Sequence, residues 1–131
     1  MRGRTARMPV TYKIDKENRL VMTTAWGSLS YPDALAHKEK LLNDPNFDPT
    51  HSQIADFTQI TEFALSNEEL RAFAEFEVFS PQSRRAFITP RDLEYGMARM
   101  FATLRELRGE KGIGVFRTLE EALDWVLAKS A

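Results

Sequence analysis

The sequence has no cysteine among its 131 residues, and this absence excludes several kinds of site at once. Disulfide frameworks, thiol nucleophiles, iron–sulfur clusters and thiolate zinc sites all require cysteine. Histidine is scarce too: His37 and His51 are the two in the chain, and they form no metal-binding motif of the HExxH kind. We therefore predict no metal site and no cofactor, with both histidines at the surface.

The sequence also lacks an excess of charge of one sign and a long apolar run. The 18 basic and 19 acidic side chains nearly cancel, so no summed field favours nucleic acid. No stretch approaches the roughly 18 consecutive apolar residues of a membrane span, and the N-terminus lacks the apolar centre of a signal peptide. We predict a cytoplasmic domain with no nucleic-acid partner and no membrane span.

The first eight residues carry three arginines and no periodic apolar pattern. We interpret residues 1–9 as a disordered tail and residues 10–131 as a single domain, which is an ordinary length for one. Because the first strand pattern follows Met8 directly, either Met1 or Met8 can be the biological start.

Alternation of apolar and polar residues predicts a hairpin of two strands over 10–14 and 20–26, with the second strand ending at Gly27. Short apolar runs predict strands over 54–57, 85–88 and 113–116. Helical patterns cover 30–43, 66–79, 90–108 and 119–129. Each helix opens with a side-chain pair able to cap free backbone N–H groups: Ser30 with Asp33, Ser66 with Glu69, Thr89 with Asp92, and Thr118 with Glu121.

Strands that alternate with helices of this length indicate parallel strands joined by right-handed crossovers. The predicted fold is α/β, with a mixed five-stranded sheet, four helices and the order ββαβαβαβα. The initial hairpin supplies an antiparallel edge.

Four runs resemble the SpoIIAA-like family of STAS-related bacterial proteins, also described as STAS/SEC14-like: Asp56–Thr58, Arg85–Pro90, Tyr95–Phe101 and Val115–Trp125. The resemblance extends over nearly the whole chain. It implies a STAS-type fold and a non-catalytic interaction or regulatory domain. The resemblance also leads us to expect a homodimer and a regulatory protein partner.

In phosphoswitch members of the STAS class, a serine that follows an aspartate at a helix start is phosphorylated. The corresponding position here is Ser66, but Ala64 and Leu65 precede it, so the acid is missing. We interpret Ser66 as an N-cap and keep a phosphosite there as the alternative.

The helix over 90–108 has an apolar stripe that we predict faces the sheet: Leu93, Met97, Met100, Leu104 and Leu107. Gly96 interrupts this helix and indicates close approach of another element, a ligand or a second subunit over Tyr95, Gly96 and Arg99. A gathering of arginines around this helix would favour an anionic ligand at its N-terminus: Arg84, Arg85, Arg91 and Arg99.

The helix over 66–79 has more aromatic surface than one side of a sheet requires. The aromatic side chains are those of Phe73, Phe76 and Phe79, with Phe63 just upstream. Such an excess is typical of plain core, of an interface or of an apolar cavity.

Two functions from different classes follow, and an enzyme has little support. The favoured one is a homodimeric interaction or regulatory domain. The alternative is binding of a small apolar or amphipathic, lipid-like ligand. An acid–base enzyme would use Asp56 and Glu62, predicted to flank the loop after a strand, but no catalytic motif accompanies them.

Overall fold

The computed structural model describes residues 9–128, so both candidate start residues and all of the predicted tail except Pro9 lie outside the described part. The elements in chain order are β1 (Val10–Asp15), β2 (Leu20–Ser30), α1 (Tyr31–Leu42), β3 (Ser52–Ala64), α2 (Asn67–Glu75), β4 (Arg85–Ile88), α3 (Asp92–Glu106), β5 (Ile113–Phe116) and α4 (Leu119–Leu127). The predicted order ββαβαβαβα is confirmed.

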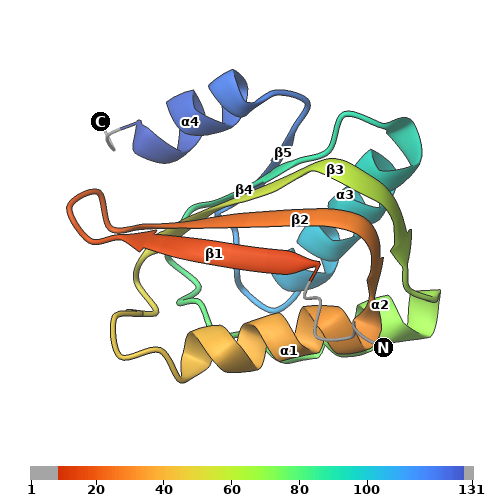
Figure 1. Ribbon diagram of the computed structural model, residues 1–131, viewed down its shortest axis with the longest axis horizontal. Helices are drawn as coiled ribbons and strands as arrows, with labels where there is room; N and C mark the ends of the chain where they lie inside the picture. The colour runs from red at the N-terminus through yellow and green to blue at the C-terminus, as the bar shows by residue number, and fades with distance from the viewer. Residues whose placement is uncertain (1–8, 129–131) are drawn as a thin grey trace, which may run out of the picture.

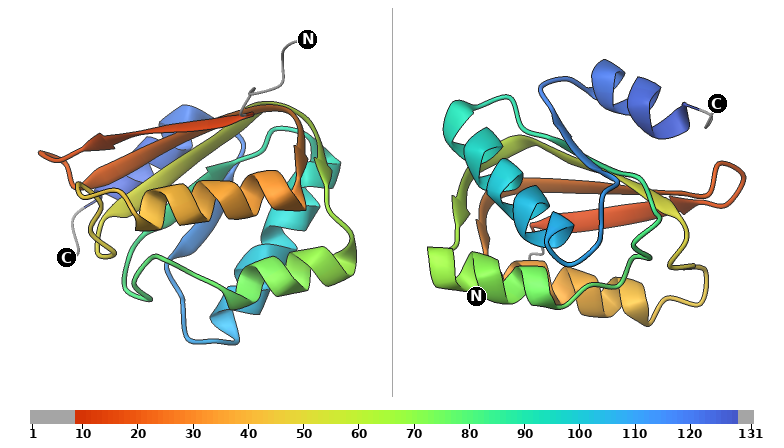
Figure 2. Two further views of the ribbon diagram at one scale, coloured as in Figure 1. Left: turned by 60° about the horizontal axis from the view of Figure 1, so that its bottom comes forward. Right: turned by 180° about the vertical axis from the view of Figure 1, so that it is seen from behind.

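The five strands form one sheet in sequence order, β1-β2-β3-β4-β5. The β1–β2 pair is antiparallel and the other three pairs are parallel, which confirms the mixed sheet. Because each right-handed crossover moves in the same direction across the sheet, the three crossover helices must share one face. Figures 1 and 2 show α1, α2 and α3 on that face and α4 alone on the other.

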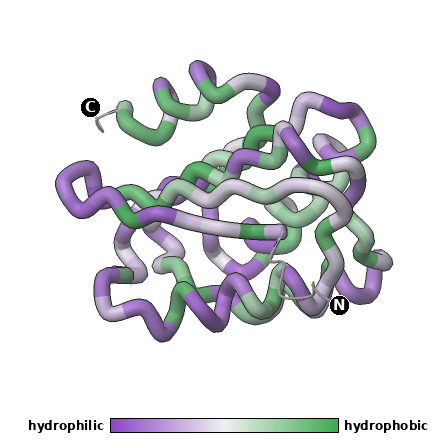
Figure 3. The backbone as a smooth tube through the Cα atoms, viewed as in Figure 1, coloured by the Kyte–Doolittle hydropathy of each residue, from purple (hydrophilic) through white to green (hydrophobic). Residues whose placement is uncertain are grey.

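Hydropathy follows this layering. Strand β4, with helices on both faces of the sheet, is buried at all four positions, whereas the turn between β1 and β2 is exposed and hydrophilic (Figure 3). On the α4 face, Ala122 and Val126 pack against Ile54, Ala86 and Ile88. Among residues 9–128 there is no helix with the length and apolar character that crossing a membrane requires.

Three of the four predicted caps are present: Ser30 with Asp33, Ser66 with Glu69, and Thr118 with Glu121. The fourth is wrong. Helix α3 begins at Asp92, and its N-cap residue Arg91 makes no side-chain cap bond. Thr89 instead extends the sheet, because its N–H donates to the Phe116 carbonyl at 2.8 Å.

Strands β2 and β3 are longer than predicted, and both are bent. Gly27 does not end β2; it adopts φ +70° beside a register shift, where β3 holds an extra residue against β2. Such bulges sharpen the twist of a strand pair. The far ends of β2 and β3 therefore curve toward α1 and α2 (Figure 1).

Helix α2 is shorter than predicted, because it ends at Glu75 and Phe76 has an extended backbone. It packs mainly on α1 and α3 rather than on a strand. Figure 2 shows it at the outer side of the helical layer. The space between α2 and the sheet is the setting of the candidate site.

The predicted core stripe of α3 is wrong for Leu93, Met100 and Leu107, whereas Met97 and Leu104 are half-buried on the inner side. The residues buried on this helix are Glu94, Ala98, Phe101, Ala102 and Arg105. Leu93 and Leu107 from the predicted stripe are 67% and 79% exposed. The pattern misleads because two charged side chains, Glu94 and Arg105, occupy the inner face.

Candidate functional site

A largely apolar cavity of about 100 Å³ lies between α2 and the helix-covered face of the sheet. Strands β2, β3 and β4 and helices α1, α2 and α3 contribute to its wall. The lining residues are Thr23, Ala34, Gln53, Ala55, Phe57, Phe63, Leu65, Leu70, Phe73, Arg85, Phe87, Met97, Ala98 and Phe101. A cavity of this size exceeds the volume that a single water molecule needs.

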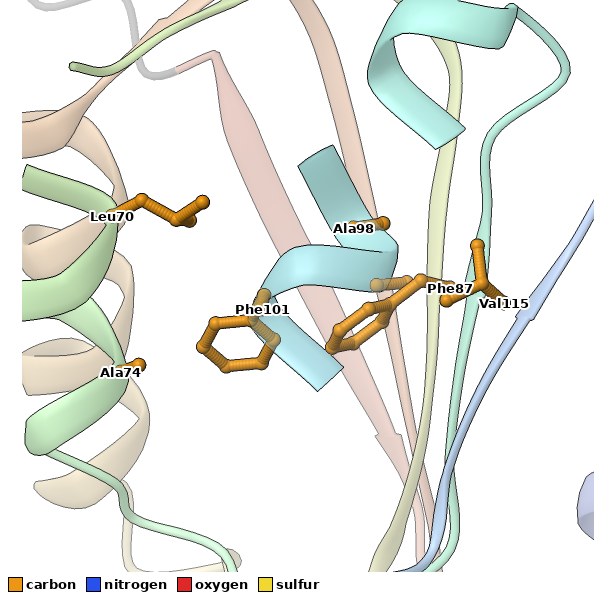
Figure 4. Packing of buried hydrophobic residues seen from close by; sticks show 7 residues of the cluster. Leu70, Ala74, Phe87, Ala98, Phe101 and Val115 are labelled. Carbon is orange, nitrogen blue, oxygen red and sulfur yellow. The ribbon is translucent and has the colours of Figure 1, made fainter. Parts of the chain in front are cut away.

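The roof of the cavity comes from α2 and α3. Leu70 and Ala74 project from α2 toward Phe101 of α3, and Phe101 bridges the distance to Phe87 on the sheet (Figure 4). The Phe87 and Phe101 ring centroids are 5.6 Å apart. One aromatic side chain thus spans the layer while the space beside it stays open.

The bend of β3 supplies another wall. Phe57 and Phe63 lie on either side of the bulged segment and pack edge to face, with ring centroids 5.0 Å apart. Phe57 also contacts Phe87, at 6.0 Å between centroids. A straight strand would carry Phe63 away from the helices, so the bulges place an aromatic ring at the cavity.

Three polar side chains form the remaining wall: Thr23 of β2, Gln53 of β3 and Arg85 of β4. All three are buried, and they join in a chain of hydrogen bonds. Arg85 Nε donates to Gln53 Oε1 at 3.1 Å, and Gln53 Nε2 donates to Thr23 Oγ1 at 3.0 Å. The apolar cavity therefore has one polar end.

Arg85 also belongs to a buried cluster of charged side chains, the ion cluster, made of Lys38, Glu77, Arg85, Arg105 and Glu110. Arg85 Nη1 lies 2.7 Å from Glu77 Oε2 and 3.2 Å from Glu110 Oε2. Arg105 Nε lies 2.8 Å from Glu110 Oε1, and Lys38 Nζ lies 3.8 Å from Glu77 Oε2. Buried charges persist only when they are paired in this way.

Two members of the ion cluster hold the carboxyl end of α2. Lys38 Nζ donates to the backbone carbonyls of Phe73 and Phe76, and Arg105 Nη1 donates to that of Ala74. The last carbonyls of a helix have no partner within it, and cations are favoured beside them. Helix α2 is thereby fixed by side chains from α1 and α3.

Burial shifts the ionisation of this region. It lowers the pKa of Lys38 to about 7, against the opposing charge of Glu77. Burial alone would raise the pKa of Glu77, but the charges of Arg85 and Lys38 hold it below its usual value. Burial, together with the charge of Arg85, lowers the pKa of His37 to about 4, so this histidine is neutral at pH 7.

The four predicted phenylalanines lie in three places. Phe63 and Phe73 line the cavity. Phe76 is the C-cap residue that follows α2, and it is 38% exposed. Phe79 is buried elsewhere, with its ring 5.2 Å from that of Phe47 and beneath the Arg85 guanidinium.

The predicted Tyr95, Gly96 and Arg99 surface does not join the cavity. Tyr95 is half-buried, with the Arg117 guanidinium 4.0 Å from its ring centroid. Gly96 and Arg99 are exposed, and a Cβ at Gly96 would meet no atom within 4 Å. Close packing within the chain therefore does not explain this glycine.

The four arginines expected to gather around an anion are separated. Arg84 stacks on Trp125 of α4, on the opposite face of the sheet from Arg85. Arg91 donates to the Thr61 carbonyl at the far end of β3. Only Arg85 lines the cavity.

Ser66 lies outside the cavity at the start of α2. Its Oγ accepts from the Glu69 N–H at 3.1 Å, and Glu69 Oε1 accepts from the Ser66 N–H at 2.9 Å. This reciprocal pair is a capping box.

Asp56 and Glu62 do not flank a loop, because both lie within β3. Asp56 accepts from the Thr58 N–H, and Glu62 is exposed. The described residues contain no group of three or more histidine, aspartate or glutamate side chains placed to hold a metal ion. His51 was predicted at the surface but is buried beside Phe47.

Sequence reasoning named Arg85 only as one of several arginines around an expected anion, and it missed Gln53 and the rest of the ion cluster as site residues. One signal was present: Arg85 opens a strand whose residues are all buried, and a charged side chain there requires a buried partner. Its partners Gln53, Glu77 and Glu110 come from three other segments. No local pattern identifies them.

The sheet order and the placement of the four helices define a SpoIIAA-like α/β fold. A solved structure with this fold, an uncharacterized protein of the DUF3478 family from Shewanella loihica PV-4, matches the chain with a TM-score of 0.58 at 18% sequence identity. The match covers 95% of this chain and 99% of that one. The resemblance found in the sequence is confirmed at the level of the fold. No family model and no curated protein sequence matches the chain.

Proposed function

We propose that this chain is a non-catalytic binding domain that holds a small apolar or amphipathic ligand in the cavity beneath α2. One observation carries the proposal: a largely apolar, partly open cavity of about 100 Å³ is lined by α1, α2, α3, the bent β3 and the adjoining strands β2 and β4. Protein interiors are close-packed, and a space of this volume deprives its lining residues of van der Waals contacts. A ligand that fills it recovers that loss.

The arrangement of charges supports a maintained cavity rather than a packing fault. Lys38 and Arg105 fix the end of α2 through its backbone carbonyls, so α2 is held away from the sheet by hydrogen bonds. A helix held at its end by buried cations is less free to collapse into the void. The domain would act in the cytoplasm, where a bound metabolite could be presented to a regulatory protein partner.

The test uses a substitution that fills the cavity. Ala98 lines it from α3, so Ala98→Leu places extra carbons inside, whereas Ala72→Leu makes the same change on the exposed side of α2. We expect benzene to raise the melting temperature of the wild type and of Ala72→Leu, because a ligand that binds only the folded state stabilises it. Ala98→Leu should fold and show no such rise. A benzene effect retained in Ala98→Leu would place the ligand elsewhere.

A second candidate function is homodimerisation through the outer side of α3. Leu93, Met100 and Leu107 are 67%, 42% and 79% exposed, and they recur every seven residues along one side of the helix. That spacing is typical of a helix seam that pairs with another helix. Gly96, exposed nearby with free space around it, would let a second chain approach closely.

A further inference from the structure

We propose that the ligand of this cavity carries a carboxylate, bound by Arg85 and Gln53 at the polar wall. This inference rests on the proposed function, since it names the chemical class that the same cavity selects. Three observations support it: the unused hydrogen-bond donors of the wall, the charge of the ion cluster, and the size of the cavity.

The polar wall has spare donors. Arg85 uses Nε for Gln53 and Nη1 for Glu77 and Glu110, and no hydrogen bond between residues 9–128 uses its Nη2 group. Gln53 Nε2 spends one of its two N–H groups on Thr23. A guanidinium and an amide with free N–H groups require an acceptor, and a carboxylate accepts several such bonds in one plane.

The charge of the ion cluster favours a monoanion. Below about pH 7, where Lys38 holds its proton, three cations, Lys38, Arg85 and Arg105, face two carboxylates, Glu77 and Glu110, which leaves one positive charge in excess. The carboxyl end of α2 offsets about half of it. One carboxylate would leave the site about half a unit negative, whereas a doubly charged phosphate would leave it about one and a half units negative in a buried site.

The rest of the wall sets the size and polarity of the ligand. Apart from Thr23, Gln53 and Arg85, every lining residue is apolar. Because an apolar cavity of about 150 Å³ holds the six carbons of benzene, this one encloses roughly four non-hydrogen atoms, and its partly open side leaves room for the rest of a somewhat larger ligand. The class is therefore a short-chain or single-ring monocarboxylic acid whose apolar part lies among the phenylalanines.

The test compares hexanoate with hexanamide, a neutral molecule of the same shape, by titration calorimetry at pH 6.5. We expect the wild type to bind hexanoate at least about tenfold more tightly than hexanamide, because one charge-assisted hydrogen bond usually has an effect of this size. Equal affinities, or tighter binding of hexanamide, would overturn this inference. If hexanoate, hexanamide and benzene all fail to bind, the proposed function fails instead.

Gln53→Glu sharpens the comparison. Glutamate keeps an acceptor for Arg85 Nε but removes the spare N–H and cancels the excess charge. We expect about a tenfold loss of hexanoate affinity and less than about a twofold change for hexanamide. Gln59→Glu, the same change at an exposed position of the same strand, should leave both affinities unchanged. If hexanoate binds Gln53→Glu as tightly as it binds the wild type, the carboxylate does not lie at this wall; should that variant fail to fold, the wild-type ratio decides.

Discussion

Arg85 connects segments that are far apart in the sequence. Its guanidinium contacts Gln53 on β3, Glu77 after α2 and Glu110 after α3, and it lies over the rings of Phe79 and Phe87. A single buried cation with partners in three segments fixes their positions relative to the sheet. The same side chain forms part of the cavity wall, so at this residue folding and binding depend on one group.

Lys38 should make the stability of the protein depend on pH. Its folded-state pKa of about 7 lies below its ordinary value of 10.5. Between these two values the unfolded chain holds a proton that the folded chain does not, so stability rises with pH across this window. The slope from this residue is at most about 1.4 kcal/mol per pH unit. It vanishes below pH 7, where both states bind the proton.

Urea unfolding from pH 7 to pH 9.5 measures this slope. We expect the unfolding free energy of the wild type minus that of Lys38→Met to increase as pH rises. Lys40→Met, at an exposed position of the same helix, should give a constant difference. Parallel curves for the wild type and Lys38→Met would show that Lys38 keeps its proton throughout.

Ser66 should contribute to stability as a cap. Ser66→Ala removes the acceptor for the Glu69 N–H and should cost about 1 kcal/mol in unfolding free energy. Ser66→Asp keeps an acceptor at the same place and should cost clearly less. Chemical denaturation of the three proteins decides. Equal losses in both variants would mean that the capping oxygen contributes nothing.

The two most exposed of the large apolar side chains in the described part are Leu93 of α3 and Leu107 at its C-cap. If this face pairs two chains, light scattering at micromolar concentration should give a dimer for the wild type and a monomer for Leu107→Glu, because a charge in such an interface loses its hydration. Leu119→Glu alters a leucine on α4 that is 43% exposed and should leave the dimer intact. A monomeric wild type, or a dimer that survives Leu107→Glu, would exclude this interface.

Element starts could be predicted from the sequence far better than element faces. The Ser66 and Thr118 caps are local chemistry, and the strands over 85–88 and 113–116 match the structure in their bounds. The inner face of α3 could not be predicted from apolar periodicity, since Arg105 is buried through ion pairs with residues distant in sequence. The aromatic excess around Phe63 and Phe73 did indicate a cavity as one of its alternatives.

At the scale of the whole molecule, the sequential strand order determines where a site can form. Open sheets whose strand order reverses have a crevice at the carboxyl ends of the strands. This sheet never reverses, so three helices crowd one face, and α2 is held above the sheet by α1 and α3. The space for a ligand therefore lies within the helical layer rather than at the sheet edge where Asp56 was expected.

Methyl NMR during a benzene titration shows directly whether the cavity beneath α2 binds a ligand. Ala55, Leu70 and Ala98 line the cavity, whereas Ala122 and Val126 lie beyond the sheet on α4. We expect saturable shifts of the methyl signals of Ala55, Leu70 and Ala98. The methyl signals of Ala122 and Val126 should not change. Shifts that do not saturate, or that are as large at Ala122 and Val126, would contradict the proposal that this cavity binds a ligand.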